Sequence, residues 1–422
     1  MLSAATVGLP GRATARQAAW KFPEHRSTAQ LAADRAHAVR QMRALSGAPE
    51  RARQILDRLQ ARQAATPGVP FDRYRNPSGA EVLVARGQLS VSTRGGALPS
   101  IIHSAQTPAA LRERGIDAAP HLIVPLGYVI KADDHPHGTE PLAPPTAVTP
   151  APVRVALVDT GIAAAARNDG WLARAVGHAD PLDIMPAAGR LDWGAGHGTF
   201  TAGIVQRVAP RCEIVAYRFT GGDGLGTDTD VATALLAAAA DGHRAGVPTI
   251  INASLGSPAA DGTPPPAMRA AVEHIAAAYP DVLIVAAAGN MGNAEPVYPA
   301  AFDQVVAVGA LTDDLQPAPF SSRGPWLTCS TVGVGVVSPF VAGVYPPERD
   351  PSQPDQTFGA DAWAMWTGTS FAAPQISGAV ARLCYEQPGL TPRAALELLL
   401  AGRPHLTGHG RVLRLLPGTP TA

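Results

Sequence analysis

The chain of 422 residues has little cysteine and no excess of charge of either sign. Its three cysteines, Cys212, Cys329 and Cys384, form no CxxC pair, which excludes a disulfide framework and a cysteine-rich zinc site. Lys and Arg together number 34, as do Asp and Glu, so we expect no overall attraction to nucleic acid or to a membrane surface. No apolar run approaches the roughly 18 residues that a membrane-spanning helix needs.

The amino terminus lacks the pattern of a secretory signal. Residues 2–9 are only weakly apolar, and the basic residues follow them, whereas a signal peptide begins with basic residues and continues into an apolar stretch. We therefore expect a cytoplasmic location.

Hydrophobic residues make up 46% of the chain, which is enough to build a large core.

Residues 1–75 form a basic segment that we predict to be helical. Apolar residues recur at helical spacing within 27–65. The segment holds 13 Lys and Arg against 5 Asp and Glu. This excess indicates either a solvated basic face or a docking surface for an acidic partner.

Residues 76–131 have a different pattern and predict a small α+β unit. EVLVARGQLSVS alternates like a strand, PAALRERG (108–115) is typical of a short helix, and HLIVPLGYVI is a second extended run. Six prolines then fall within residues 132–152, where they prevent a continuous helix and remove donors for a sheet. We interpret 132–152 as an extended linker that leads to a larger domain over 153–422.

The larger domain alternates short apolar runs with Ala-rich helical stretches. Such alternation indicates an α/β fold, because a parallel sheet covered on both faces needs near-continuous apolar strands and intervening helices. The expected strands are 153–158, 213–219, 248–252, 282–288 and 304–310, and the expected helices are 198–206, 229–246, 267–279, 369–386 and 392–401.

Three polar residues lie where a parallel sheet is expected to have its active or binding site, because ligands bind beyond the carboxyl ends of parallel strands. Asp159 ends the apolar run VALVD, whereas His197 in GHGTFTAGI and Ser370 in GTSFAAP each lie at the start of an expected helix. An imidazole can take the proton of an attacking serine hydroxyl, and a carboxylate can fix the tautomer of that imidazole. The three residue types together predict nucleophilic catalysis by Ser370.

Two further groups are suited to stabilising the negative oxygen that forms on attack. Asn290 follows the apolar run in VLIVAAAGN, and its side-chain amide can donate to that oxygen. Ser370 lies at the start of an expected helix. Its backbone N–H and the positive end of the helix dipole are therefore directed toward the same negative oxygen. Together they predict an oxyanion hole.

The order of these motifs resembles the subtilisin-like serine protease family, the subtilases. VDTGI, GHGT and GTSFAAP surround Asp159, His197 and Ser370, and INASLGSP, AAAGNMGN and FSSRGP occur in the family's order. The resemblance covers 153–402. It implies a three-layer domain with a mostly parallel central sheet, and a serine endopeptidase that cuts polypeptides through an acyl-enzyme. One departure is Phe200, where the family usually has a second histidine outside the triad.

The resemblance also implies which residues line the substrate cleft. An extended substrate would lie between two edges of the protein backbone and pair with both of them. The short connection after His197 lacks the insertion that forms a high-affinity calcium site in many secreted relatives, which argues against that site and leaves a weak metal site open. The resemblance implies no cofactor, and we assign no residue to a metal. The implied cleft residues are Ser254, Leu255 and Gly256 on one edge, Gly222, Asp223 and Gly224 on the other, and Ala288 and Gly289 beside the primary pocket.

Several alternatives remain open. A single DTG would also fit half of an aspartic protease, but the chain contains no second DTG or DSG. A catalytic domain that had lost turnover would act as a binding scaffold. Residues 1–152 would be either a propeptide that inhibits the enzyme and is cut off within 131–152, or a retained regulatory module. Asp223, Asp228 and Asp230 would either cap a helix and bind solvent, or favour basic residues in the substrate.

Overall fold

The computed structural model describes residues 135–418, apart from 144–145, 147, 184–188, 223, 260–263 and 346–354, and also 123–126. Before residue 123 it describes only the backbones of four strands. The helices predicted within 27–65 and over 108–115 lie outside this part of the chain. Two compact units form. The first contains Met1–Ile123 with Thr227–Thr229 and Ala259–Ala270, and the second contains the other residues from Val124 onward.

The first unit contains an antiparallel four-stranded sheet in the order β2-β3-β1-β4. β3 coincides with the start of the strand expected from residue 81. β1 and β2 come from the segment predicted as helical, so this sheet joins the two N-terminal parts that the sequence analysis treats separately. The strands are β1 (Ala4–Leu9), β2 (Asp72–Arg75), β3 (Glu81–Val84) and β4 (Asp117–His121).

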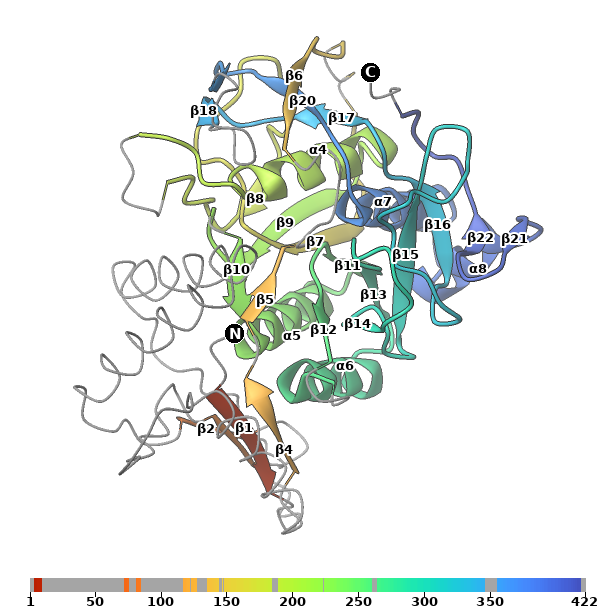
Figure 1. Cartoon of the computed structure of the whole chain (residues 1–422). Coiled ribbons are helices and arrows are strands. Elements are labelled where there is room, and N and C mark those ends of the chain that lie inside the picture. The colour runs from red at the N-terminus through yellow and green to blue at the C-terminus, as the bar shows by residue number, and fades with distance from the viewer. Residues whose placement is uncertain are drawn as a thin grey trace. The chain divides into compact units, whose positions relative to one another are not determined.

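The second unit is built on a nine-stranded sheet in the order β21-β22-β16-β15-β13-β11-β7-β9-β8 (Figure 1). Every neighbouring pair in it is parallel except β21 with β22. Its strands are β7 (Arg154–Asp159), β8 (Ala175–Gly177), β9 (Glu213–Arg218), β11 (Thr249–Ala253), β13 (Val282–Ala287), β15 (Val305–Leu311), β16 (Cys329–Val332), β21 (His405–Leu406) and β22 (Gly410–Val412).

Helices cover both faces of this sheet and make three layers (Figure 1). On one face, Val155 and Leu157 of β7 share a core cluster with Val205 of α4 and Ile376 of α7. Alternate residues of each strand face the opposite layer, which explains why the strands are apolar on both faces. The helices are α4 (His197–Val208), α5 (Asp228–Ala245), α6 (Pro266–Ala278), α7 (Thr369–Glu386) and α8 (Pro392–Leu400).

Smaller sheets complete the two units. β6 lies inside the proline-rich stretch predicted as a linker and pairs with β20, so part of that stretch is an edge strand of the second unit. The remaining strands are β5 (Ile123–Pro125), β6 (His137–Thr139), β10 (Leu225–Thr227), β12 (Ser257–Pro258), β14 (Val297–Tyr298), β17 (Val336–Pro339), β18 (Gly343–Tyr345), β19 (Gln356–Phe358) and β20 (Trp363–Trp366).

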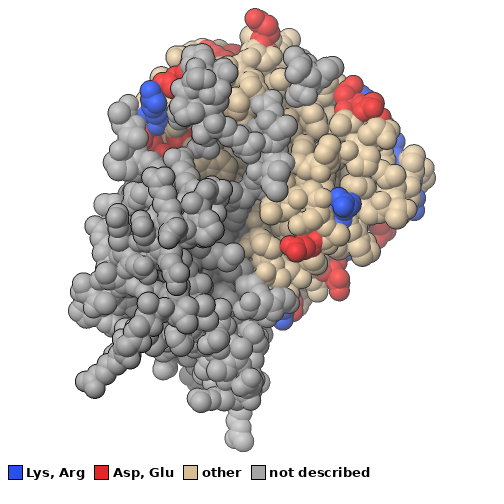
Figure 2. All heavy atoms as spheres, viewed as in Figure 1, with Lys and Arg blue, Asp and Glu red and all other residues tan. Residues whose placement is uncertain are grey.

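The surface and the cysteines agree with the composition of the chain. Charged side chains of described residues are scattered over the face drawn in Figure 2 and form no patch of one sign there. Cys212, Cys329 and Cys384 are all buried as free thiols. Among the described helices, none has the length and apolarity to cross a membrane.

Candidate active site

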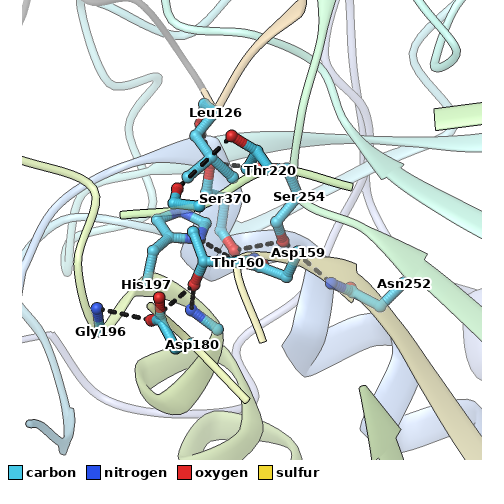
Figure 3. A network of polar contacts seen from close by, with 12 residues as sticks. Leu126, Asp159, Thr160, Asp180, Gly196, His197, Thr220, Asn252, Ser254 and Ser370 are labelled. Atoms are coloured by element: carbon cyan, nitrogen blue, oxygen red, sulfur yellow. Dashed lines mark hydrogen bonds and ion pairs between the residues drawn. The ribbon is translucent and has the colours of Figure 1, made fainter. Parts of the chain in front are cut away.

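Asp159 and His197 meet at the carboxyl end of β7 (Figure 3). Asp159 is the last residue of that strand, His197 is the first residue of α4, and they are 0% and 4% exposed. His197 Nδ1 lies 2.8 Å from Asp159 Oδ1, which also accepts a hydrogen bond from the Thr160 backbone N–H at 2.8 Å. A carboxylate that holds Nδ1–H leaves Nε2 as the basic nitrogen of the ring.

Two glycines allow β7 and α4 to approach this closely. A Cβ built on Gly198 would lie 2.0 Å from the carbonyl oxygen of Gly161. Gly161 has a φ of 108°, and a Cβ there would lie 2.7 Å from the carbonyl group of Ala179. Side chains at either position would force the strand end and the helix start apart, and would separate Asp159 from His197.

Aromatic rings line one side of the His197 imidazole. Trp366 makes an edge contact with it at 5.6 Å between ring centroids, and Phe371 lies 5.2 Å away. Phe200 is fully buried and contacts Phe371 at 4.6 Å. The phenylalanine that departs from the family pattern therefore fills the core. It packs against Phe371, which with Trp366 shields one side of the imidazole from water.

Ser370 is the second residue of α7 and is 2% exposed. Its hydroxyl lies 3.3 Å from the carbonyl oxygen of Ser254 and 3.4 Å from that of Leu126. The next residue, Phe371, contacts the His197 ring, so the serine and the imidazole belong to the same site (Figure 3).

A chain of buried side chains holds the backbone of Ser370. Ser254 Oγ donates to the Ser370 carbonyl at 2.8 Å, and Asn252 Nδ2 donates to Ser254 Oγ at 2.9 Å. Ser377 Oγ then donates to Asn252 Oδ1 at 2.9 Å. Ser254, which the resemblance assigns only to a cleft wall, thus also fixes the start of α7.

Asn290 lies just beyond β13 with its amide in a fixed orientation. Its Oδ1 accepts hydrogen bonds from the backbone N–H of Thr369 at 2.9 Å and from the Thr369 hydroxyl at 2.8 Å. The Thr369 hydroxyl also accepts from the Gly289 N–H at 3.2 Å. Because the oxygen end of the amide is held by the residue before Ser370, the NH₂ end is the one turned to other acceptors.

The residues assigned to the cleft lie where strands of the main sheet end. Ser254, Leu255 and Gly256 follow β11, Ala288 and Gly289 follow β13, and Gly222 and Gly224 follow β9, while Asp223 lies outside the described residues. The chain itself supplies a peptide there, since Leu126 N–H donates to the Gly224 carbonyl at 3.0 Å and Leu126 is 2% exposed. A backbone segment thus lies between the Gly224 edge and Ser370.

Asp180 is a buried acidic residue of this site that the sequence analysis did not identify. Its Oδ2 accepts hydrogen bonds from Thr160 Oγ1 at 2.8 Å and from the Gly196 N–H at 2.9 Å (Figure 3). Burial raises the pKa of Asp180 to about 8, and these hydrogen bonds oppose the shift only in part. No motif marks this residue, because its burial depends on the path of the loop between β8 and α4.

Asp228 fits the helix-capping alternative. It is fully buried, and its carboxylate accepts hydrogen bonds from Ala267 N–H at 3.0 Å and Met268 N–H at 2.9 Å, at the start of α6. A carboxylate used in this way stabilises the helix N-terminus.

Within the described residues, no cluster of three or more His, Cys, Asp or Glu side chains is arranged to hold a metal ion.

Comparison with known proteins decides the family. The subtilase family profile matches residues 151–410, more than half of the chain. The chain belongs to the subtilase family. It is 29% identical over 262 residues to subtilisin BL of Lederbergia lenta, an alignment that spans 59% of this chain and 82% of that protein. It is 31% identical over 262 residues to alkaline elastase YaB of Bacillus sp. (strain YaB), over 59% of this chain and 58% of that protein.

Among solved structures, this subtilase is similar to a cold adapted subtilisin-like serine proteinase. The two are 24% identical with a TM-score of 0.45, and the alignment covers 62% of this chain and 89% of that one. The family profile and the curated relatives confirm the predicted family and enzyme class. The mostly parallel sheet with helices on both faces confirms the predicted three-layer α/β fold. The protein is a serine protease that hydrolyses peptide bonds.

Proposed function

We propose that this subtilase cuts polypeptides internally through Asp159, His197 and Ser370. Ser370 Oγ attacks a peptide carbonyl and passes its proton to His197 Nε2, while Asp159 holds Nδ1–H and stabilises the imidazolium. The leaving amine takes the proton from His197, and water then hydrolyses the acyl-enzyme with the same base. The observation that carries this proposal is the 2.8 Å contact between His197 Nδ1 and Asp159 Oδ1 at the site of Ser370.

The test compares the wild-type chain with the Ser370→Ala variant, purified from the same host, on an unfolded polypeptide. New internal termini should appear with the wild type only. Equal cleavage by both preparations would point to a contaminating protease. Cleavage by neither, after long incubation, would favour the alternative of a binding scaffold that has lost turnover.

Asn290 and the Ser370 N–H would hold the oxyanion. Replacing Asn290 with alanine should lower kcat by about 10²–10³ with little change in KM, the effect that the loss of such an amide donor has in subtilisin itself. Steady-state kinetics on a chromogenic peptide measure both constants. The matched control is Asn293→Ala, in the same loop. Within the described part of the chain, the Asn293 side chain accepts a local bond from Glu295 N–H, and its loss should leave kcat unchanged. A raised KM at constant kcat would contradict the oxyanion role.

The N-terminal region would inhibit the enzyme by placing its own backbone in the cleft. The Leu126 carbonyl oxygen lies 3.4 Å from Ser370 Oγ, and Leu126 N–H pairs with the Gly224 carbonyl. Such backbone pairing at a sheet edge is how an extended substrate is held. The bond expected to be cut is therefore Leu126–Gly127, which lies before the 131–152 stretch expected from the sequence.

Mass spectrometry of the purified chains tests this self-cleavage. The wild type should accumulate a fragment that begins at Gly127, whereas Ser370→Ala should remain intact. Because the step is intramolecular, its rate constant should not change on dilution. A wild-type chain that stays intact while it cleaves an added peptide would contradict the proposal and favour a retained regulatory module.

A further inference from the structure

Asp180 contacts the sequence neighbours of two residues proposed for the triad, namely Thr160, which follows Asp159, and Gly196, which precedes His197. Its second carboxyl oxygen, Oδ1, is buried and meets no hydrogen-bond partner among the described residues. Asp180 as a whole is 6% exposed. A carboxyl group in this situation is costly to ionise, because one oxygen of the anion would lack both water and a donor.

The hydrogen bonds of Asp180 connect the segment that carries Asp159 to the segment that carries His197. Thr160, which follows Asp159, donates its hydroxyl to Asp180 Oδ2, and Gly196, which precedes His197, donates its N–H to the same oxygen. The Thr160 hydroxyl also accepts from Gly198 N–H at 3.0 Å. The backbone on both sides of His197 is thereby fixed to the turn that follows Asp159.

We propose that Asp180, in its protonated and neutral form, is a positioning residue that holds the His197 imidazole on Asp159. A neutral carboxyl suits these contacts better than an anion does. Its carbonyl oxygen accepts both donors, and the group left without a partner among the described residues is a neutral hydroxyl and not a charge. Asp180 touches no reacting atom, and its effect passes through the first turn of α4 and the turn after β7.

The charged and titratable groups around Asp180 agree with a neutral carboxyl. Asp159 on β7 opposes ionisation, whereas Arg218 on β9 favours it from an exposed position and is partly screened by solvent. His197 on α4 follows Gly196, whose N–H contacts Asp180. His178 lies in the loop after β8 that also contains Asp180, and it accepts a hydrogen bond from Arg218 N–H at 3.0 Å. Burial outweighs these effects and raises the pKa of Asp180 to about 8.

The first experiment measures kcat against pH for wild type, Asp180→Ala and Asp180→Asn. At pH 7 the alanine variant should lose about tenfold or more in kcat, because both donors lose their acceptor, and the asparagine variant should recover most of that loss. In the wild type, kcat should fall as Asp180 ionises near pH 8, because a second anion then lies beside Asp159. Asp180→Asn should lack this alkaline transition.

Other outcomes of this experiment overturn the inference. If asparagine loses as much kcat at pH 7 as alanine does, the site needs a negative charge and the neutral form is wrong. If both variants stay within threefold of the wild type, or if the asparagine variant keeps the alkaline transition, Asp180 does not position His197 in the way proposed.

A second experiment does not depend on activity, and therefore separates this inference from the proposed function on which it rests. In the Ser370→Ala background, the melting temperature is compared with and without Asp180→Asn from pH 5 to pH 8.5. The unfolded chain loses the Asp180 proton near pH 4, whereas the folded chain keeps it until about pH 8. Stability should therefore fall as pH rises across this interval, and only in the chain that retains Asp180.

We compare the melting temperature of the Asp180→Asn variant with that of the chain that retains Asp180. The difference in favour of the asparagine variant should grow from pH 5 to pH 8 and stay constant at higher pH. Asp169→Asn is the matched control, since hydrogen bonds from Arg167, Trp171 and Trp363 outweigh burial and lower the pKa of Asp169. Its loss of stability should be constant over this range, because Asp169 is ionised in both states. An advantage for Asp180→Asn that shrinks as pH rises would overturn the inference even if the protease has no measurable activity.

Discussion

Replacing Ser370 with alanine should lower kcat for peptide hydrolysis by about 10⁶, the loss that removal of the nucleophile causes in subtilisin itself. The neighbouring hydroxyls cannot take its place, because Ser254 Oγ donates to the Ser370 carbonyl and Thr369 Oγ1 donates to Asn290 Oδ1. Steady-state kinetics on a chromogenic peptide, with enzyme freed of its N-terminal region, measure the loss.

Two comparisons define what this loss means. Ser330→Ala is the matched control. Ser330 lies on β16, is equally buried and donates to the His409 carbonyl, so this variant should keep kcat within threefold. The double variant of Ser370 and His197 should be no slower than Ser370→Ala alone, because residues that act as one unit are not additive. A further drop of 10² or more in the double variant would contradict a shared mechanism.

Replacing Asp159 with asparagine should lower kcat by about 10⁴ while KM changes little. Asp159 Oδ1 accepts from both His197 Nδ1 and Thr160 N–H. An amide that turns its NH₂ group to the ring would make Nδ1 the acceptor, so that Nε2 carries the proton and cannot act as the base toward Ser370. Kinetics at several pH values measure the effect.

Asp228→Asn provides a control at an equally buried aspartate. Asp228 caps α6. The Asp228→Asn substitution should therefore lower the free energy of unfolding by on the order of 1 kcal/mol, without lowering kcat more than threefold. If Asp159→Asn loses less than tenfold in kcat, or if the two variants lose similar amounts, Asp159 does not orient the imidazole.

The sequence predicts most of the catalytic domain because local patterns and topology agree there. The run ending at Asp159 becomes β7, and the helices expected over 198–206 and 369–386 become α4 and α7. In a parallel sheet the carboxyl ends of strands share one edge, so Asp159 and Asn290 could be placed together from their positions after apolar runs. The glycines at 161 and 198 belong to the same motifs and permit the approach.

Other features depend on tertiary structure and leave no local pattern. Asp180 is a carboxylate in a loop, and only the fold shows that it is buried against Thr160 and Gly196. Leu126 lies in an extended run that the sequence could place in the N-terminal unit, but its hydrogen bond to Gly224 joins residues far apart in the chain. β6 is short and rich in polar residues, and it forms a strand only because β20 supplies a partner.

The most direct test of the central claim is the site at which a serine-directed phosphonate reacts. We expect a single adduct, mapped by mass spectrometry to Ser370 in the wild type, absent from Ser370→Ala and formed far more slowly in His197→Ala. A wild-type protein that cleaves peptides but carries the adduct on another residue, or carries none, would contradict the role of Ser370 as the nucleophile.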